Sequence, residues 1–171
     1  MKDGGNQSRK GGAVASEPDE TFLVAFLNTL DVEDGTDAIA DKTGLAAWAG
    51  EHGLEPGDLS EAQRTRDALR ELAVGEHPKL PAVMLEPSYA GGTIRLKAAT
   101  VAEAALAAAV ILGVQGRLAR VKLCPADDCR EAFYDLSRNG SRTWCSMEIC
   151  GNRQKARSFR SKHADAGVAN S

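Results

Sequence analysis

Residues 124–150 read CPADDCREAFYDLSRNGSRTWCSMEIC and contain every cysteine of the chain. The cysteines form two pairs of identical spacing, Cys124-x4-Cys129 and Cys145-x4-Cys150, with fifteen residues between the pairs. Structural zinc sites use this arrangement, because a tetrahedral ion with Zn–S bonds of about 2.3 Å usually takes its thiolates as two close pairs from different elements. The sequence therefore predicts one structural zinc ion bound by all four cysteines.

Two other states of these thiols are alternatives to zinc. Disulfides would need an oxidising compartment, but the only early apolar run, Phe22 to Leu30, is short and follows acidic residues, unlike a secretory signal. A redox-sensitive zinc-thiolate switch is the second alternative, because basic neighbours such as Arg130 and Arg153 favour thiolate character. No further cysteine is present to resolve an oxidised one. We expect a zinc-binding, cytoplasmic protein.

Charge divides the chain into two parts. The formal net charge of the 171 residues is −3, yet residues 1–116 carry ten Lys/Arg against eighteen Asp/Glu, and residues 117–171 carry eleven against six. This division predicts an acidic domain over residues 19–120 and a basic module over residues 121–163. The Gly-rich residues 1–18 and the terminal residues 164–171 offer little apolar surface to bury, so we expect both to be disordered tails.

The acidic domain has mainly helical patterns. Apolar residues from Phe22 to Leu30 recur at helical spacing, and Leu45 and Trp48 lie one turn apart in a second helix over residues 41–51. Ser60 and Gln63 resemble a capping box that begins a third helix, which Gly75 would close. Charges of both signs alternate along this third helix, as they commonly do on a solvated face; its basic residues are Arg64, Arg66 and Arg70.

A small β-hairpin and a long alanine-rich helix are expected to complete the domain. Prolines block helix between residues 78 and 87, so residues 83–85 are predicted to pair with residues 93–97. The run Ala98 to Val114 approaches the length of a membrane span but is rich in alanine and contains Glu103, which favours a buried helix over about residues 101–120. We therefore expect no contact with a membrane.

The basic module is predicted to be a treble-clef-like zinc finger made of a knuckle, a hairpin and a helix. Residues 133–134 and 143–144 flank a turn and would form the hairpin, and Ser146 is a plausible N-cap for the helix. Three aromatic residues would form a small core: Phe133, Trp144 and Phe159. With so little apolar surface, the metal would supply folding free energy on the order of 10 kcal/mol. The fold class is accordingly α+β.

At these residues the sequence resembles a known family, the CGNR zinc fingers, named for Cys150-Gly151-Asn152-Arg153. The resemblance covers the cysteines, Phe133 to Arg142, the Trp-Cys-Ser-Met segment and the basic helix. Upstream, residues 26–30 and 45–49 look like the N-terminal domain that accompanies this finger in bacterial proteins described as stress-induced transcription regulators. The resemblance implies such a regulator, with the four cysteines as zinc ligands. Gly140 and Thr143 stand where many family members carry Arg.

A DNA-binding role rests on the basic residues of the finger. Arg153, Arg157 and Arg160 fall on one helical face, and together with basic neighbours they could neutralise several phosphates. The candidate contacts are Arg138, Arg142, Arg153, Lys155, Arg157, Arg160 and Lys162. In the alternative interpretation, the basic helix keeps a zinc-stabilised protein-interaction module soluble or docks onto the acidic domain of the same chain. A homodimer would help so small a module to bind DNA tightly.

No pattern indicates an enzyme. The three histidines are isolated, and neither a phosphate-binding glycine loop nor a carboxylate pair is evident. The polar pair Asn28-Thr29 inside an apolar helix could line a small-molecule pocket, or it could be satisfied by structural hydrogen bonds. The sequence identifies neither an effector of the N-terminal domain nor a DNA target.

Overall fold

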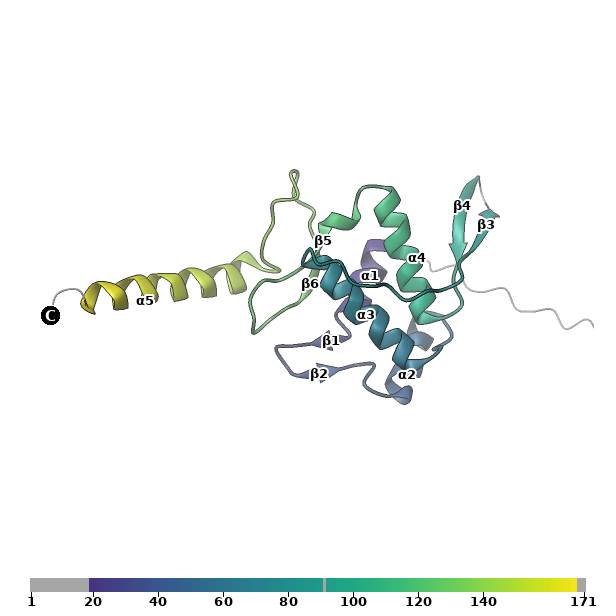
Figure 1. Cartoon of the computed structure of the whole chain (residues 1–171), viewed down its shortest axis with the longest axis horizontal. Coiled ribbons are helices and arrows are strands. Elements are labelled where there is room, and N and C mark those ends of the chain that lie inside the picture. Colours follow the sequence, from purple (N-terminus) through teal and green to yellow (C-terminus); the bar gives the residue numbers. More distant parts are fainter. Residues whose placement is uncertain (1–18, 91, 169–171) are drawn as a thin grey trace, which may run out of the picture.

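A computed structural model describes residues 19–90 and 92–168, and it has an α+β architecture (Figure 1). The segment expected to form the N-terminal tail, residues 1–18, lies outside the described residues, as do residues 169–171. The helices are α1 (Asp19–Leu27), α2 (Lys42–Glu51), α3 (Leu59–Ala73), α4 (Val101–Val114) and α5 (Asn152–Val168). Two shorter helical turns are η1 (Leu118–Arg120) and η2 (Met147–Gly151).

The strands form three antiparallel pairs of two strands each. They are β1 (Leu30–Asp31) with β2 (Thr36–Asp37), β3 (Glu86–Ala90) with β4 (Thr93–Lys97), and β5 (Val121–Leu123) with β6 (Ala132–Tyr134). The middle pair confirms the predicted hairpin but shifts its first strand, because Glu86 pairs with Lys97 and Ser88 with Arg95. Residues 83–85 precede the strand instead of forming it.

The main core lies where α1, α3 and α4 meet (Figure 1). Its largest fully buried side chains include Phe26, Leu45 and Leu112, each at most 1% exposed. Every alanine of α4 is buried, since small side chains let neighbouring helices approach closely. The part of the alanine-rich run from Val101 to Ala109 therefore belongs to the core, as expected, whereas Val110 and Val114 are exposed. Within the described residues, the helices are too short or too polar to cross a membrane.

Several helix limits differ from the sequence-based expectation. Helix α1 ends at Leu27, so Leu30 begins β1, and α5 runs to Val168 through part of the expected C-terminal tail. The N-cap of α3 is Asp58, whose carboxylate accepts the Glu61 backbone N–H at 2.9 Å, while Ser60 merely donates its hydroxyl to the same carboxylate. An ionised side chain competes well for this position, because it also suits the positive end of the helix dipole. The α4 helix ends at Val114, before the expected limit of residue 120, and Gly116 turns the chain at φ +68°.

The expectation that the charged residues of α3 lie on a solvated face is partly wrong. Arg64 is exposed, but Arg66 and Arg70 are 3% and 8% exposed. Arg66 donates to the Asp37 carboxylate at 2.6 Å, which provides the charge partner that a buried guanidinium needs. Arg70 donates to two backbone carbonyls, those of Leu27 at 2.7 Å and Arg130 at 2.9 Å. These arginines hold distant segments together.

The β5–β6 pair joins the cysteine-containing region to the helical core. Val121, Leu123 and Ala132 belong to the same buried cluster as α1 and α3. The register pairs Lys122 with Phe133 and Leu123 with Ala132. Residues 133–134 therefore pair with β5 and not with residues 143–144, so the expected finger hairpin is wrong.

Candidate metal centre

The four cysteine sulfurs converge in one place. The Sγ atoms of Cys124, Cys129, Cys145 and Cys150 all lie within 4.8 Å of one another, and none of the cysteines forms a disulfide. Cys145 Sγ lies 3.6 Å from both Cys129 Sγ and Cys150 Sγ. A zinc tetrahedron with bonds of about 2.3 Å has edges of about 3.8 Å, so the sulfurs have the spacing that the ion requires. This cluster could hold one zinc ion.

The first cysteine pair stands on the β5–β6 pair. Cys124 follows β5 directly, and its backbone N–H donates to the Glu131 carbonyl at 2.8 Å. The turn closes where the Cys129 N–H donates to the Ala126 carbonyl at 3.0 Å. Arg130 then adopts φ +57°, a left-handed conformation that is unfavourable for a residue with a side chain. This turn brings the chain back into β6, and both ligands are fixed by backbone that belongs to the main core.

The second pair is positioned by a wide helical turn. Ser146 accepts the Ile149 backbone N–H at 3.2 Å, which confirms its predicted role as N-cap. The following turn, η2, has π-helical hydrogen bonding and leads directly into α5. Cys145 and Cys150 therefore lie at the root of α5.

The residues after Cys150 each have a structural role in this centre. A Cβ atom on Gly151 would lie 2.6 Å from Met147 Sδ and 3.4 Å from Trp144 Cδ1, so glycine lets these two side chains pack against the turn. Asn152 donates its amide to the Glu148 carbonyl at 3.0 Å. Arg153 donates to Cys150 Sγ at 3.2 Å. The last contact stabilises negative charge on a sulfur, which is the form that binds zinc.

The thiols differ in how readily they ionise. Burial raises the pKa of Cys129 to about 11, and burial likewise raises the pKa of Cys145. Burial also opposes ionisation of Cys150, but the Arg153 guanidinium and the neighbouring thiols lower its pKa below the ordinary value. The two thiols whose pKa values are raised, Cys129 and Cys145, need a nearby cation before they lose their protons. The donor set therefore fits a divalent metal.

A network of charges surrounds the centre. Arg157 donates to the Asp128 carboxylate at 2.6 Å, and this contact lowers the pKa of Asp128. Arg153 lies 3.4 Å from the same carboxylate and 3.2 Å from Glu33 on the loop between β1 and β2. Two of the expected DNA contacts are thus already paired with carboxylates of the chain. Neither Asp128 nor Glu33 stood out in the sequence.

The remaining candidate contacts fall into two groups. The Arg142 guanidinium donates to the Trp144 and Cys145 carbonyls and lies 4.8 Å from the Phe133 ring centre, so it supports the loop before the second cysteine pair. Arg138, Lys155 and Arg160 are exposed. The Lys162 side chain lies outside the described residues.

The expected aromatic core of the finger is only partly present, because Phe159 is 66% exposed.

Asp135 organises the loop between the two cysteine pairs. It is fully buried and accepts the Lys122 ammonium at 2.7 Å and the backbone N–H groups of Ser137 and Arg142. Burial opposes its ionisation, but these donors hold the pKa of Asp135 far below its usual range. Lys122 also donates to the Gly140 and Arg142 carbonyls. These polar contacts satisfy the loop backbone and explain why residues 143–144 do not extend the β5–β6 pair.

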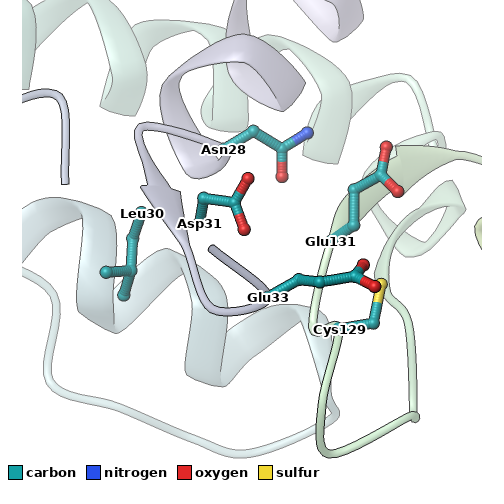
Figure 2. Close-up of a pocket in the computed structure, with 6 residues that line it drawn as sticks. All are labelled: Asn28, Leu30, Asp31, Glu33, Cys129 and Glu131. Atoms are coloured by element: carbon teal, nitrogen blue, oxygen red, sulfur yellow. The ribbon is translucent and has the colours of Figure 1, made fainter. Parts of the chain in front are cut away.

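Figure 2 shows a small acidic pocket beside the centre. It has a volume of about 160 Å³ and is lined by Asn28, Leu30, Asp31, Glu33, Cys129 and Glu131. The Glu33 carboxylate points toward the side of the pocket formed by Cys129 (Figure 2). Asn28 lines this pocket, and its amide is also satisfied by Ala132, to which it donates and from which it accepts. The structural hydrogen bonds expected of Asn28 are thus confirmed, and a small-molecule role for this pocket stays a prediction.

Comparison with protein families agrees with this two-part organisation. Residues 120–163 match the CGNR zinc finger, the part that carries the cysteine cluster. Residues 20–120 match a family described as ABATE, putative stress-induced transcription regulator. That second match covers more than half of the chain, and the protein belongs to this family. A search of curated proteins found no match.

Proposed function

We propose that the protein is a DNA-binding transcription regulator in which α5 contacts DNA and the N-terminal domain responds to a partner or effector. The observation that carries this proposal is the position of α5, which projects away from the rest of the molecule (Figure 1). Its described side chains, residues 152–161, include four basic residues and no acidic one. A solitary basic helix suits the major groove of DNA, which is wide enough to admit an α-helix.

The charges along α5 suggest which part would meet the phosphates. Near its root, Arg153 and Arg157 are paired with carboxylates of the chain, and the acidic pocket beside Cys129 would repel DNA there. Lys155 and Arg160 are exposed. Phosphate contacts made by these two residues would stabilise binding in a strongly salt-dependent way, because each releases condensed counterions.

A double substitution tests the proposal. Lys155→Ala with Arg160→Ala should weaken binding of a labelled random duplex and flatten its salt dependence, with zinc content unchanged. The matched control is Lys42→Ala with Lys79→Ala, which removes the same charge from exposed sites on other surfaces. Equal binding by the wild type and both double variants at low salt would show that α5 makes no phosphate contacts.

A protein-interaction module is the second candidate, and exposed apolar residues on the finger favour it. Met147, Ile149 and Phe159 are 54%, 63% and 66% exposed, which is unusual for large side chains in so small a unit. Substituting Met147 and Ile149 by Ser separates the two functions. Loss of a protein partner with unchanged DNA affinity would support this second candidate.

A further inference from the structure

An apolar cavity opens between the helical core and the segment that leads into the metal centre. It has a volume of about 350 Å³, and its lining includes Leu23, Leu27, Leu69, Leu72, Ala73 and Val121. Leu23, Leu27 and Leu69 are at most 2% exposed and lie beneath the cavity, which opens to the surface between partly buried residues such as Leu72, Ala73 and Leu118. None of the residues that line it is charged.

We propose that this cavity binds a small, neutral, apolar molecule. Its volume falls within the range of small-molecule sites, roughly 300–1,000 Å³, and such sites are mostly apolar. A carboxylate, phosphate or ammonium group would lose its hydration there without gaining a charged partner. An aromatic or branched aliphatic molecule would instead exchange water for apolar contacts. The inference rests on the proposed function, because it names the chemical class of the effector.

The position of the cavity connects it to the metal centre. Its walls come from α1, α3, η1 and from β5, whose last residue precedes Cys124. The Leu27 carbonyl accepts Arg70, which also reaches the Arg130 carbonyl beside Cys129. The next residue, Asn28, is hydrogen-bonded to Ala132. A molecule that moves Leu27 therefore acts on the contacts that hold the first pair of zinc ligands.

The size and the uncharged lining of this recess suit a small apolar molecule. A second copy of the chain would need a protruding apolar side chain to fill the same volume. Beside this cavity, β5 packs on α1 and α3. A ligand that binds one arrangement of these three elements more tightly than another increases the population of the arrangement that it binds.

Binding of the neutral fluorophore N-phenyl-1-naphthylamine to the full zinc-loaded chain tests this site. We expect saturable binding of one molecule per chain, lost in Ala73→Phe because the new ring fills the cavity. Ala47→Phe is the control, since Ala47 is exposed on α2 and lies outside the lining. No binding by the wild type, or equal binding by Ala73→Phe, would overturn the proposal. Zinc content and melting temperature report whether each variant folds, and Leu118→Phe replaces Ala73→Phe if that variant does not.

The same measurements distinguish a small molecule from two other possible occupants of the cavity. A wild-type dimer that binds the fluorophore only after dissociation would place a second copy in the cavity. Binding that appears only when residues 1–18 are removed would assign it to that segment. Either result overturns the small-molecule site.

Amide hydrogen exchange at Ala132 tests the coupling. We expect its rate to change when the fluorophore binds, and an unchanged rate would exclude coupling through Leu27 and Asn28. None of these measurements uses DNA, so their failure leaves the proposed DNA-binding role standing, and failure to bind DNA leaves this site standing.

Discussion

Asn28 and Ala132 lie 104 residues apart in sequence and exchange two hydrogen bonds. The Asn28 side-chain amide donates to the Ala132 carbonyl at 2.9 Å, and the Ala132 backbone N–H donates to the Asn28 Oδ1 at 2.7 Å. The Asn28 amide thus makes with β6 the pair of hydrogen bonds that the backbone of a neighbouring strand would make on that edge. It connects the end of α1 to the strand that follows the first cysteine pair.

Asn28→Asp should weaken this connection. The carboxylate can still accept the Ala132 N–H, but it cannot donate to the Ala132 carbonyl and repels it. We expect the free energy of unfolding to fall by about 1–3 kcal/mol, the usual cost of leaving a buried polar group unpaired. Chemical denaturation of the zinc-loaded protein measures this. The exposed Asn139→Asp serves as control, and equal effects of the two substitutions would contradict the role of Asn28.

Arg66→Ala should destabilise the fold far more than Arg64→Ala. Both arginines lie on α3, but Arg66 is buried against Asp37 and Thr29, whereas Arg64 is exposed. Removing one partner of a buried ion pair leaves the other partially desolvated, at a cost of about 3 kcal/mol. Thermal unfolding distinguishes the variants. Similar melting temperatures would show that the Asp37 carboxylate is adequately solvated without Arg66.

Metal removal should affect the two tryptophans differently. Trp144 packs against the cysteine cluster, and Trp48 packs against Phe22 and Phe26 in the helical core. Chelation should therefore change Trp144 emission in a Trp48→Phe variant and leave Trp48 emission unchanged in a Trp144→Phe variant. Steady-state fluorescence during chelator titration makes the comparison. A change in both variants would mean that the helical core also depends on the metal.

Arg153→Ala should lower zinc affinity by about 10–100-fold, the usual effect of removing a group that hydrogen-bonds to a metal ligand. The physical cause is the loss of the donor to Cys150 Sγ. Competition with a chromophoric chelator measures the affinity. Lys155→Ala, two residues further along α5 and exposed, is the control. If Arg153→Ala binds zinc as tightly as the control, the guanidinium does not support the thiolate.

Glu33→Gln should weaken the contact between the acidic loop and the finger while retaining the metal. The Glu33 carboxylate lies 3.2 Å from Arg153, and both side chains are partly exposed, so we expect a loss of stability below about 1 kcal/mol. If the proposed DNA role holds, affinity for a random duplex should rise, because a negative charge is removed near the root of α5. Unchanged affinity at low salt would place DNA away from this loop.

The metal centre could be predicted from sequence because metal geometry leaves little freedom in ligand spacing. Four cysteines in two equal pairs, with Ser146 as a helix start, specify most of the site locally. Helical periodicity likewise located α1 and α2. These signals involve residues that are close together in the chain.

The features that sequence could not reveal depend on partners far along the chain. Arg66 and Arg70 look like the exposed Arg64, and only Asp37 and the Arg130 carbonyl make them structural. In the same way, the sequence presents Arg153 and Arg157 as unpaired basic residues, whereas the structure pairs them with Glu33 and Asp128. The charge pattern of a sequence gives the sign of the charge on a surface, but it does not identify the residue that pairs with each charged side chain.

Two of the four cysteines belong to the body of the protein, and the other two belong to the base of α5. Cys124 and Cys129 are anchored through β5 and β6 in the helical core, whereas Cys145 and Cys150 stand at the root of α5. A metal ion held by all four is therefore a cross-link whose bonds run through the joint between the body and the projecting helix. With the ion bound there, the direction of α5 would be fixed relative to the body, so metal occupancy would affect the orientation of the helix as well as the folding of the finger.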